Sequence, residues 1–154
     1  MYPIHMAFPK YIPNIRSGTV SKVYDGDTIT IYSKIPYLFR SPYYSFSIRL
    51  ARIDCPEIKS TDEEEKTSAM FVRDELSDIL LNNKVKLKVI DTDKYGRLLC
   101  EVYFKNVNIN DWLLDNHYAV PYDGNTKHPP DSWKAYMSSA RPKRFVATPR
   151  FCFF

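Results

Sequence analysis

The chain has 154 residues, 44% of them hydrophobic, which fits a single compact domain with a core of its own. Its 22 Lys and Arg residues exceed its 18 Asp and Glu residues, which gives a formal charge of +4 and a pI near 8.9. This charge favours a polyanionic partner but leaves nucleic acid and an anionic membrane surface both open. No segment is long and apolar enough to span a bilayer, so no transmembrane helix is predicted.

The cysteines and the first residues bear on the cellular compartment. Cys55, Cys100 and Cys152 stand far apart without C-x-x-C spacing, so neither a disulfide framework nor a structural zinc site is predicted. The first 14 residues include three prolines that interrupt any apolar run, and they do not resemble a secretory signal. A reducing, intracellular compartment is therefore favoured.

The first part of the chain predicts an arm followed by strands. Residues 1–18 form a proline-containing arm that is extended on the domain or disordered. Two short strands are expected at residues 19–24 and 28–32, joined by the turn Asp-Gly-Asp, and a third at residues 46–53, where both faces are apolar. Residues 33–47 contain two prolines and an aromatic cluster, and they are interpreted as a long connection.

The helical period begins after the acidic run at residues 62–65. This run is interpreted as the solvated first turn of a helix rather than as a metal site, because a helix N-terminus favours negative charge. The apolar stripe of the helix is formed by Ala69, Val72, Leu76, Ile79 and Leu80.

The second half of the chain predicts a hairpin and then small helices. Residues 84–90 alternate lysine with apolar residues and form an amphipathic strand, with its partner strand at residues 98–104. Short helices are expected within residues 107–118 and 131–141, the second of them stopped by Pro142. This order of elements predicts an α+β domain, a small closed β-barrel with helices packed against it.

Three short motifs contain residues that could carry chemistry. They are Tyr-Asp-Gly-Asp-Thr at residues 24–28, Arg-Leu-Ala-Arg-Ile-Asp-Cys-Pro-Glu at residues 49–57, and Thr-Asp-Lys-Tyr-Gly-Arg at residues 92–97. Each has an ordinary explanation when it is taken alone, since Asp-Gly is a common hairpin turn and the others can end a strand or form a basic turn. The hypothesis of a functional site depends on their combination.

Together the motifs contain the parts that phosphodiester hydrolysis needs. Asp27 and Asp54 can supply two carboxylates to a hard cation such as Ca²⁺. A cation flanked by guanidinium groups neutralises the charge that grows on the non-bridging oxygens in the transition state, and Arg49 and Arg97 are the candidate guanidinium groups. Glu57 is the candidate to orient or deprotonate the attacking water.

The order Asp-Gly-Asp-Thr, Arg-x-x-x-x-Asp-x-Pro-Glu and Asp-Lys-Tyr-Gly-Arg resembles the staphylococcal nuclease (thermonuclease) family, from about residue 20 to about residue 122. The resemblance implies a five-stranded OB-type barrel with packed helices. It also implies calcium-dependent cleavage of DNA, preferably single-stranded, and of RNA, with 3′-phosphate ends. A monomer that acts on nucleic acid and not at a membrane is expected.

The resemblance assigns roles to individual positions. Asp27 and Asp54 match the family's calcium carboxylates, and Cys55 matches a ligand that contributes only its backbone carbonyl, where threonine is common. The positions matching the catalytic residues, two phosphate-binding arginines and the glutamate usually assigned as general base, are Arg49, Arg97 and Glu57. The positions matching residues that contact a neighbouring phosphate or the base are Lys94, Tyr95 and Tyr122.

Some segments depart from the family or lie outside its motifs. Residues 58–66 look shorter than the family's mobile loop beside the active site. The connection at residues 33–47 looks longer, and it either packs on the barrel or helps to grip single-stranded substrate through stacking and phosphate contact. The residues proposed for that grip are Tyr37, Phe39, Arg40, Tyr43 and Tyr44.

Three further expectations concern the edges of the resemblance. Arg52 lies outside the motif spacing and is expected to form an ion pair away from the scissile phosphate. The domain is expected to span residues 19–141. The basic, aromatic tail at residues 142–154 is expected to cover the barrel.

Two alternatives to a nuclease stay open. One is a non-catalytic module of the same fold that binds single-stranded nucleic acid or protein, and the other is an OB-like interaction domain of unrelated ancestry. The joint occurrence of the three motifs argues against unrelated ancestry. The residues whose retention argues against a non-catalytic module are Asp27, Arg49, Asp54, Glu57 and Arg97.

Overall fold

In the computed structural model, which describes residues 9–146, five strands close into a barrel in the order β3-β2-β1-β5-β6. The strands are β1 (Ser17–Asp25), β2 (Thr28–Lys34), β3 (Tyr43–Leu50), β5 (Lys84–Thr92) and β6 (Leu98–Phe104). Neighbours in this order are antiparallel, and the parallel pairing of β3 with β6 closes the barrel. The predicted α+β fold, a five-stranded OB-type barrel with packed helices, is confirmed.

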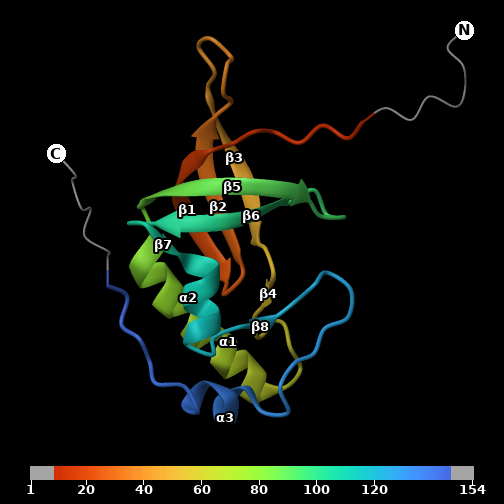
Figure 1. The fold of residues 1–154 in the computed structure, drawn as a ribbon, viewed down its shortest axis with the longest axis vertical. Coiled ribbons are helices and arrows are strands. Elements are labelled where there is room, and N and C mark those ends of the chain that lie inside the picture. The colour runs from red at the N-terminus through yellow and green to blue at the C-terminus, as the bar shows by residue number, and fades with distance from the viewer. Residues whose placement is uncertain (1–8, 147–154) are drawn as a thin grey trace, which may run out of the picture.

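The remaining elements lie mainly at one end of the barrel. Figure 1 shows the helices gathered at that end and the β2–β3 hairpin projecting at the other. The helices that the described residues form are α1 (Glu63–Leu80), α2 (Ile109–Asp115) and α3 (Trp133–Ser138). Two short strands, β4 (Ile53–Asp54) and β8 (Val120–Pro121), pair with each other, and β7 (Val107–Asn108) extends the sheet beside β6.

The turn between β1 and β2 is pressed against α1. A Cβ atom on Gly26 would lie 2.7 Å from the Val72 side chain and 2.8 Å from Cys55 Sγ, so only glycine fits without a shift. The predicted strand pair and its turn are confirmed, with the strands longer than expected. This close packing holds Asp25 and Asp27, which flank the glycine, next to the helix end of the barrel.

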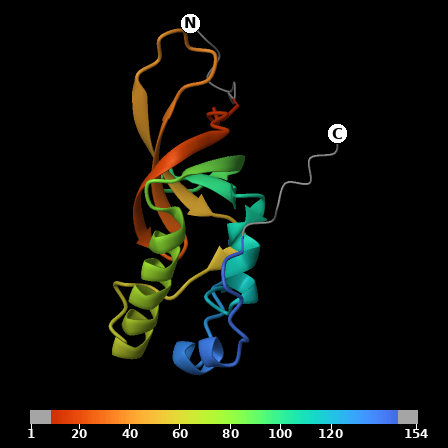
Figure 2. The same ribbon diagram turned by 90° about the vertical axis from the view of Figure 1, so that its left-hand side faces the viewer.

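The expected long connection at residues 33–47 is wrong. Strands β2 and β3 continue through most of it, and their register runs unbroken from Thr28↔Arg49 to Lys34↔Tyr43. In β3, large side chains at residues 44, 46 and 48 alternate with serines at residues 45 and 47, which suits a pleated ladder. Both prolines fall in the loop at residues 35–42, where no ladder hydrogen bond is lost. Figure 2 shows this hairpin standing beyond the barrel.

The expected single strand at residues 46–53 is also wrong, because it is interrupted. Arg52 adopts a positive φ of 66°, and the chain turns there from β3 into β4. The Ala51 N–H donates to the Cys100 carbonyl, and the Asn110 side-chain amide donates to the Ala51 carbonyl, which fixes the turn from two sides. The turn sends Asp54 back toward the β1–β2 turn.

The predicted first helix is confirmed as α1, with Asp62 as its N-cap. Its buried face includes four of the five predicted stripe residues, and the fifth, Ile79, is partly buried against the core. The acidic first turn is mostly exposed, as expected, but it also binds the rest of the chain. Glu64 Oε1 accepts a hydrogen bond from the Ser132 hydroxyl at 2.7 Å, which joins α1 to the start of α3.

The described ends of the chain pack on the barrel. Ile15 is buried in the core, and Phe145 stacks on Phe104 with ring centroids 5.7 Å apart. Cys55 and Cys100 are buried free thiols, whereas Cys152 and most of the predicted tail lie outside the described residues, as do residues 1–8. No helix within residues 9–146 has the length and apolar character needed to cross a membrane.

Candidate active site

Four segments that are far apart in the sequence meet at one cavity of about 320 Å³. They are the β1–β2 turn, the end of β3 with β4 and the residues after it, the β5–β6 turn, and the loop that follows β8. Eight of the nine predicted site residues line this cavity: Asp27, Arg49, Asp54, Glu57, Lys94, Tyr95, Arg97 and Tyr122. The ninth, Cys55, is buried behind it, 2% exposed.

Arg49 lies between two buried carboxylates. Its Nη2 atom is 3.0 Å from Asp27 Oδ2 and 3.2 Å from Asp54 Oδ1, and none of the three side chains is more than 10% exposed. Its Nη1 atom donates to the Leu50 carbonyl at 2.9 Å. Charges buried in this way must be mutually compensated, so the three side chains form one electrostatic unit.

Asp27 is held by groups from several elements. The Thr28 hydroxyl donates to Oδ1 at 2.9 Å, and the Cys55 N–H donates to Oδ2 at 3.2 Å. The Leu50 N–H donates to the Asp27 backbone carbonyl at 2.8 Å. The carboxylate is therefore preorganised by β2 and by the chain on both sides of β4.

The β5–β6 turn orients the second guanidinium group. Arg97 Nε donates to Asp93 Oδ2 at 2.6 Å, and Arg97 Nη1 donates to the Thr28 hydroxyl at 3.2 Å. Tyr95, at the tip of the turn, is 72% exposed, and the cations of Lys94 and Arg97 lie 5.1 Å and 5.5 Å from its ring centroid. Both arginines thus approach the same edge of the cavity, with an exposed aromatic ring beside them.

Glu57 is held near the cavity by its neighbours. Its N–H donates to Glu65 Oε1 at 3.0 Å, so the first turn of α1 anchors this residue. Its carboxylate accepts a hydrogen bond from Lys127, whose Nζ is also 3.0 Å from Asp54 Oδ1. The Glu57 side chain stays 55% exposed and is accessible to water.

The sequence of residues 47–145 matches the family described as staphylococcal nuclease homologue. This match covers more than half of the chain. The chain belongs to the staphylococcal nuclease family.

Three relatives of this staphylococcal nuclease homologue are similar to it over part of their length. An uncharacterized endonuclease of Haemophilus influenzae is 36% identical over 103 residues, which cover 67% of this chain and 51% of that protein. Endonuclease Htp3 of Saprolegnia parasitica is 28% identical over 117 residues, 68% of this chain and 55% of that protein. The probable staphylococcal-like nuclease CAN2 of Oryza sativa is 30% identical over 84 residues, 54% of this chain and 21% of that protein. The chain therefore spans about half or less of the length of these relatives.

Two charged cavity residues that hydrogen-bond to predicted site residues escaped the sequence analysis of this staphylococcal nuclease homologue. Lys127 comes from the loop between β8 and α3, 70 residues from Glu57 in sequence, and a lone lysine in such a loop carries no recognisable signal. Burial lowers the pKa of Lys127, but the hydrogen bonds to Glu57 and Asp54 outweigh this effect and raise the pKa above its usual range. The ammonium group therefore stays charged.

Asp25 is the other missed residue. Its Oδ1 accepts a hydrogen bond from the Asp27 N–H at 3.3 Å. Burial, and then the negative charge of Asp27, raise the pKa of Asp25 to about 7. The spacing Asp-Gly-Asp in the first motif could have indicated that a second carboxyl group flanks the same turn.

The donor set fits a hard cation. Asp25, Asp27 and Asp54 supply carboxyl oxygens at one cavity, and Ca²⁺ prefers such ligands together with carbonyls and waters. Within the described residues, however, no group of three or more His, Cys, Asp and Glu side chains forms a ready-made metal cluster. Burial raises the pKa of the Cys55 thiol well above its usual value, so its sulfur stays protonated and is a poor ligand.

A second cavity, of about 570 Å³, adjoins the first. Both cavities are lined by Tyr122, whose N–H donates to the Arg52 carbonyl at 2.8 Å, and the second also contains the apolar side chains of Ile90 and Leu99. An aromatic side chain and apolar surface next to a cavity that contains Arg49 and Arg97 are features that suit a nucleobase.

Arg52 forms the ion pairs that the sequence analysis expected. Its Nη2 atom is 2.9 Å from Glu101 Oε2 and 2.8 Å from Asp111 Oδ1. Glu101 is buried, and hydrogen bonding by Arg52 lowers its pKa below the usual value. Arg52 thus compensates a buried carboxylate on β6, which confirms the expected ion pair away from the cavity.

Proposed function

We propose that this chain hydrolyses phosphodiester bonds of single-stranded DNA and of RNA with the aid of calcium, and leaves 3′-phosphate ends. The observation that carries the proposal is the buried unit in which Arg49 lies between Asp27 and Asp54, in the same cavity as Arg97 and Glu57. The names of the endonuclease relatives support a nuclease.

The arginines bind the scissile phosphate in this proposal. Their planar groups present several N–H donors to the non-bridging oxygens, where negative charge grows in the transition state. Asp93 and Thr28 hold Arg97, and the two buried carboxylates hold Arg49, so neither must reorganise during the reaction. Asp27, Asp54 and the Cys55 carbonyl would hold the calcium ion, which supplies a positive charge beside the phosphate when it is bound.

Glu57 acts as the general base. It takes a proton from a water molecule as the water oxygen bonds to phosphorus. The bond from phosphorus to the 5′ oxygen then breaks, and that oxygen takes a proton from solvent, which leaves a 3′-phosphate and a 5′-hydroxyl. Since Lys127 hydrogen-bonds the Glu57 carboxylate, this contact must open before Glu57 accepts the proton.

Three further side chains contact the substrate in the proposal. Lys94 and Tyr95 lie on the exposed β5–β6 turn, where they can bind a phosphate next to the scissile one. Tyr122 lines both cavities and can pack against a base. We propose that the protein cleaves nucleic acid as a monomer.

The test is cleavage of end-labelled single-stranded DNA and RNA by the purified protein, with calcium or with a chelator. We expect calcium-dependent products whose mobility changes on treatment with a 3′-phosphatase. Cleavage that persists in chelator, or 3′-hydroxyl products, would contradict the calcium and product assignments. Binding of the oligonucleotide without any cleavage would favour the alternative, a non-catalytic binding module.

A further inference from the structure

One face of strand β3 leads from the candidate active site to the projecting hairpin. Side chains alternate along a strand, so every second residue shares a face. On β3, Ile48 is buried in the core and Phe46 packs against it. The residues on the opposite, outer face are Tyr43, Ser45, Ser47 and Arg49.

The outer face continues on β2 and β1. Ile29 and Ile31 of β2 are buried in the core, so Thr28, Thr30, Tyr32 and Lys34 face outward. On β1, Lys22 is the register partner of Thr30, and Tyr24 lines the active-site cavity. The ammonium groups of Lys22 and Lys59 lie 5.5 Å and 5.9 Å from the Tyr24 ring centroid. Lys22 and Tyr24 thus add a cation and an aromatic ring to this face near the cavity.

The face ends in a groove of about 650 Å³. Its cationic lining residues are Arg16, Lys34 and Lys84, and its aromatic ones are Tyr32, Tyr37 and Tyr43. No carboxylate lines the groove, and none of the three cations has an ion pair within the described part of the chain. Residues 28–53, which form β2, the hairpin and β3, contain no Asp or Glu at all.

The aromatic side chains of this face are available to a ligand. Tyr37 is 90% exposed and Phe39 87% exposed at the hairpin tip, and Tyr43 is 65% exposed. Tyr32 and Tyr43 form an edge-to-face pair with centroids 5.7 Å apart, and Lys34 lies 5.2 Å from the Tyr43 centroid. Rings held in this way can stack on bases while the neighbouring cations bind the backbone.

We propose that this outer face, from Arg49 to the groove at Tyr43, binds a single strand of DNA or RNA that extends from the active site. The inference rests on the proposed function and adds a second binding site to it. Tyr43 and Arg49, at the two ends of the face, are six residues apart on β3, which corresponds to a length of about 20 Å at roughly 3.3 Å per residue. A single strand with bases stacked about 3.4 Å apart would place on the order of six nucleotides along this length.

A nucleic acid fits this face better than a lipid surface does. The aromatic and basic residues are spread along the strands and lead into the phosphate-binding cavity, so one continuous polyanion can occupy both. A membrane would meet only the hairpin tip, because the rest of the face runs back along the barrel (Figures 1 and 2). The continuity of this face with the active-site cavity therefore selects a strand of phosphates and bases.

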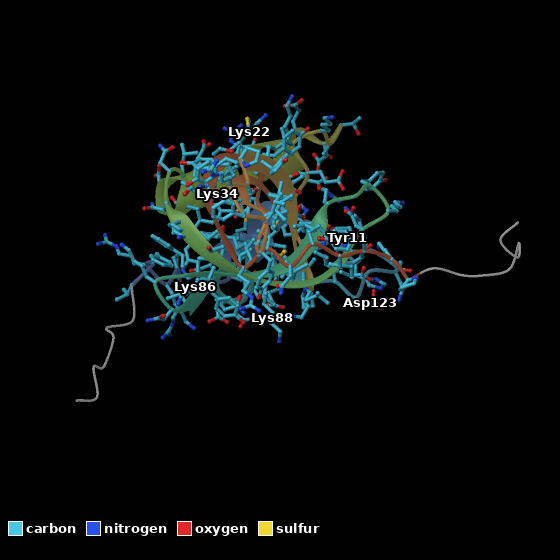
Figure 3. All side chains as sticks on the ribbon, turned by 90° about the horizontal axis from the view of Figure 1, so that it is seen from above. Tyr11, Lys22, Lys34, Lys86, Lys88 and Asp123 are labelled. Atoms are coloured by element: carbon cyan, nitrogen blue, oxygen red, sulfur yellow. The ribbon has the colours of Figure 1, made fainter. Side chains whose placement is uncertain are left out.

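The test compares oligonucleotides of about 3 and about 12 nucleotides, since only the longer one can reach the groove. The variant is Lys34→Gln combined with Tyr37→Ala. Its control is Lys88→Gln combined with Tyr11→Ala, which removes the same two side-chain types from exposed positions. Figure 3, seen from the hairpin end, shows Lys88 and Tyr11 away from Lys34 and Lys22.

We expect the double variant to lose roughly tenfold or more in kcat/KM on the long oligonucleotide, through KM, because stacking of one base contributes about a 5- to 150-fold effect. The short oligonucleotide and the control variant should be unaffected. The slope of log KM against log salt should fall by about 0.7 for the lost lysine. An equal loss on both lengths, or no loss on the long one, overturns the proposal.

If the parent protein cleaves neither oligonucleotide, that result contradicts the proposed function but not the binding face. A binding measurement then tests the binding face separately. Fluorescence anisotropy of a labelled oligonucleotide of about 12 nucleotides, in chelator, should show weaker binding by the double variant than by the control. Equal affinity overturns the proposal. Cosedimentation with phosphatidylserine vesicles is measured in parallel, and if the double variant loses vesicle binding but keeps oligonucleotide affinity, the face is a membrane contact and the proposal is wrong.

Discussion

Arg49 and Arg52 lie close in sequence but have different surroundings. Arg49 joins two carboxylates inside the cavity, whereas Arg52 compensates Glu101 on β6. We expect Arg49→Lys to lower turnover by about 10² to 10³, because lysine keeps the charge but loses the planar fork. Arg52→Lys should lower it much less. Steady-state cleavage of single-stranded DNA at saturating calcium, with folding checked by thermal melts, measures both. A crippled Arg52→Lys with a near-normal Arg49→Lys would require a different site.

We expect Arg52 to contribute to the stability of the fold and not to turnover. Arg52→Gln leaves the Glu101 carboxylate buried without its cation, and within the described residues the Asn108 side-chain amide remains as its hydrogen-bond donor. We expect a loss of about 1 to 3 kcal/mol in the free energy of unfolding at pH 7, less than for a fully buried pair because Arg52 is half exposed.

The loss in Arg52→Gln should depend on pH in a defined direction. Arg52 lowers the folded-state pKa of Glu101, so the pair contributes its full stability above the unfolded pKa of about 4.3 and loses it as the pH falls through the folded value. Denaturant unfolding at pH 7 and near pH 3 should show a smaller difference between parent and variant at the lower pH. The control Lys143→Gln, which removes an exposed pair with Asp115, should cost about 0 to 0.5 kcal/mol. An equal difference at both pH values would contradict this role.

Lys127 brings a positive charge to the carboxylates that are proposed to hold calcium. Because a nearby cation repels a second one, Lys127→Gln should raise the calcium affinity by about tenfold. Calorimetric titration with calcium measures the change, and Lys134→Gln on α3 is the control of equal charge. Unchanged or weaker calcium binding in Lys127→Gln would mean that Lys127 does not compete with the ion.

At the scale of elements, the position of the β1–β2 turn depends on its contact with α1. Gly26→Ala puts a methyl group within 2.7 Å of Val72 and 2.8 Å of Cys55 Sγ. We expect a loss of about 1 to 3 kcal/mol in stability from overpacking, together with reduced turnover, because the turn carries Asp25 and Asp27. Denaturant unfolding and cleavage assays measure these effects. In a Val72→Ala background, Gly26→Ala should lower the stability by less than it does in the parent protein. If the stability effects of the two substitutions are strictly additive, the contact with Val72 is not the cause of the loss.

At the scale of the whole molecule, the closed barrel and its projecting hairpin are separable. Lys34 and Tyr43 are register partners, so a two-residue Asn-Gly turn can replace residues 35–42. Most of the replaced side chains are exposed. We therefore expect a change of less than about 1 kcal/mol in stability, since surface changes have small effects. Thermal and denaturant unfolding test this, and a large destabilisation would show that the loop supports the barrel.

Much of the fold followed from local patterns. Alternation indicated β2 and β5, and the turns beside them indicated their partners β1 and β6. The apolar stripe with its acidic first turn indicated α1, because a half-buried helix imposes its own period on the sequence. The order of the three motifs indicated the family and grouped seven residues that line one cavity, and the resemblance added Tyr122 as the eighth. Their catalytic and ligand roles stay predictions.

Other features depended on tertiary contacts. The break at Arg52 accompanies the pairing of β4 with β8, and it leaves no local signal. The extension of the hairpin to Lys34 and Tyr43 follows from the pairing of β2 with β3, and the alternation within β3 does not by itself set where the strand begins. Lys127 reaches Glu57 across 70 residues of sequence. Periodicity reports which face of an element is buried. Barrel closure and the path of the chain around the barrel decide which distant loop meets that face. The sequence therefore predicted the motif residues of the site, whereas only the folded chain showed that Lys127 belongs to it.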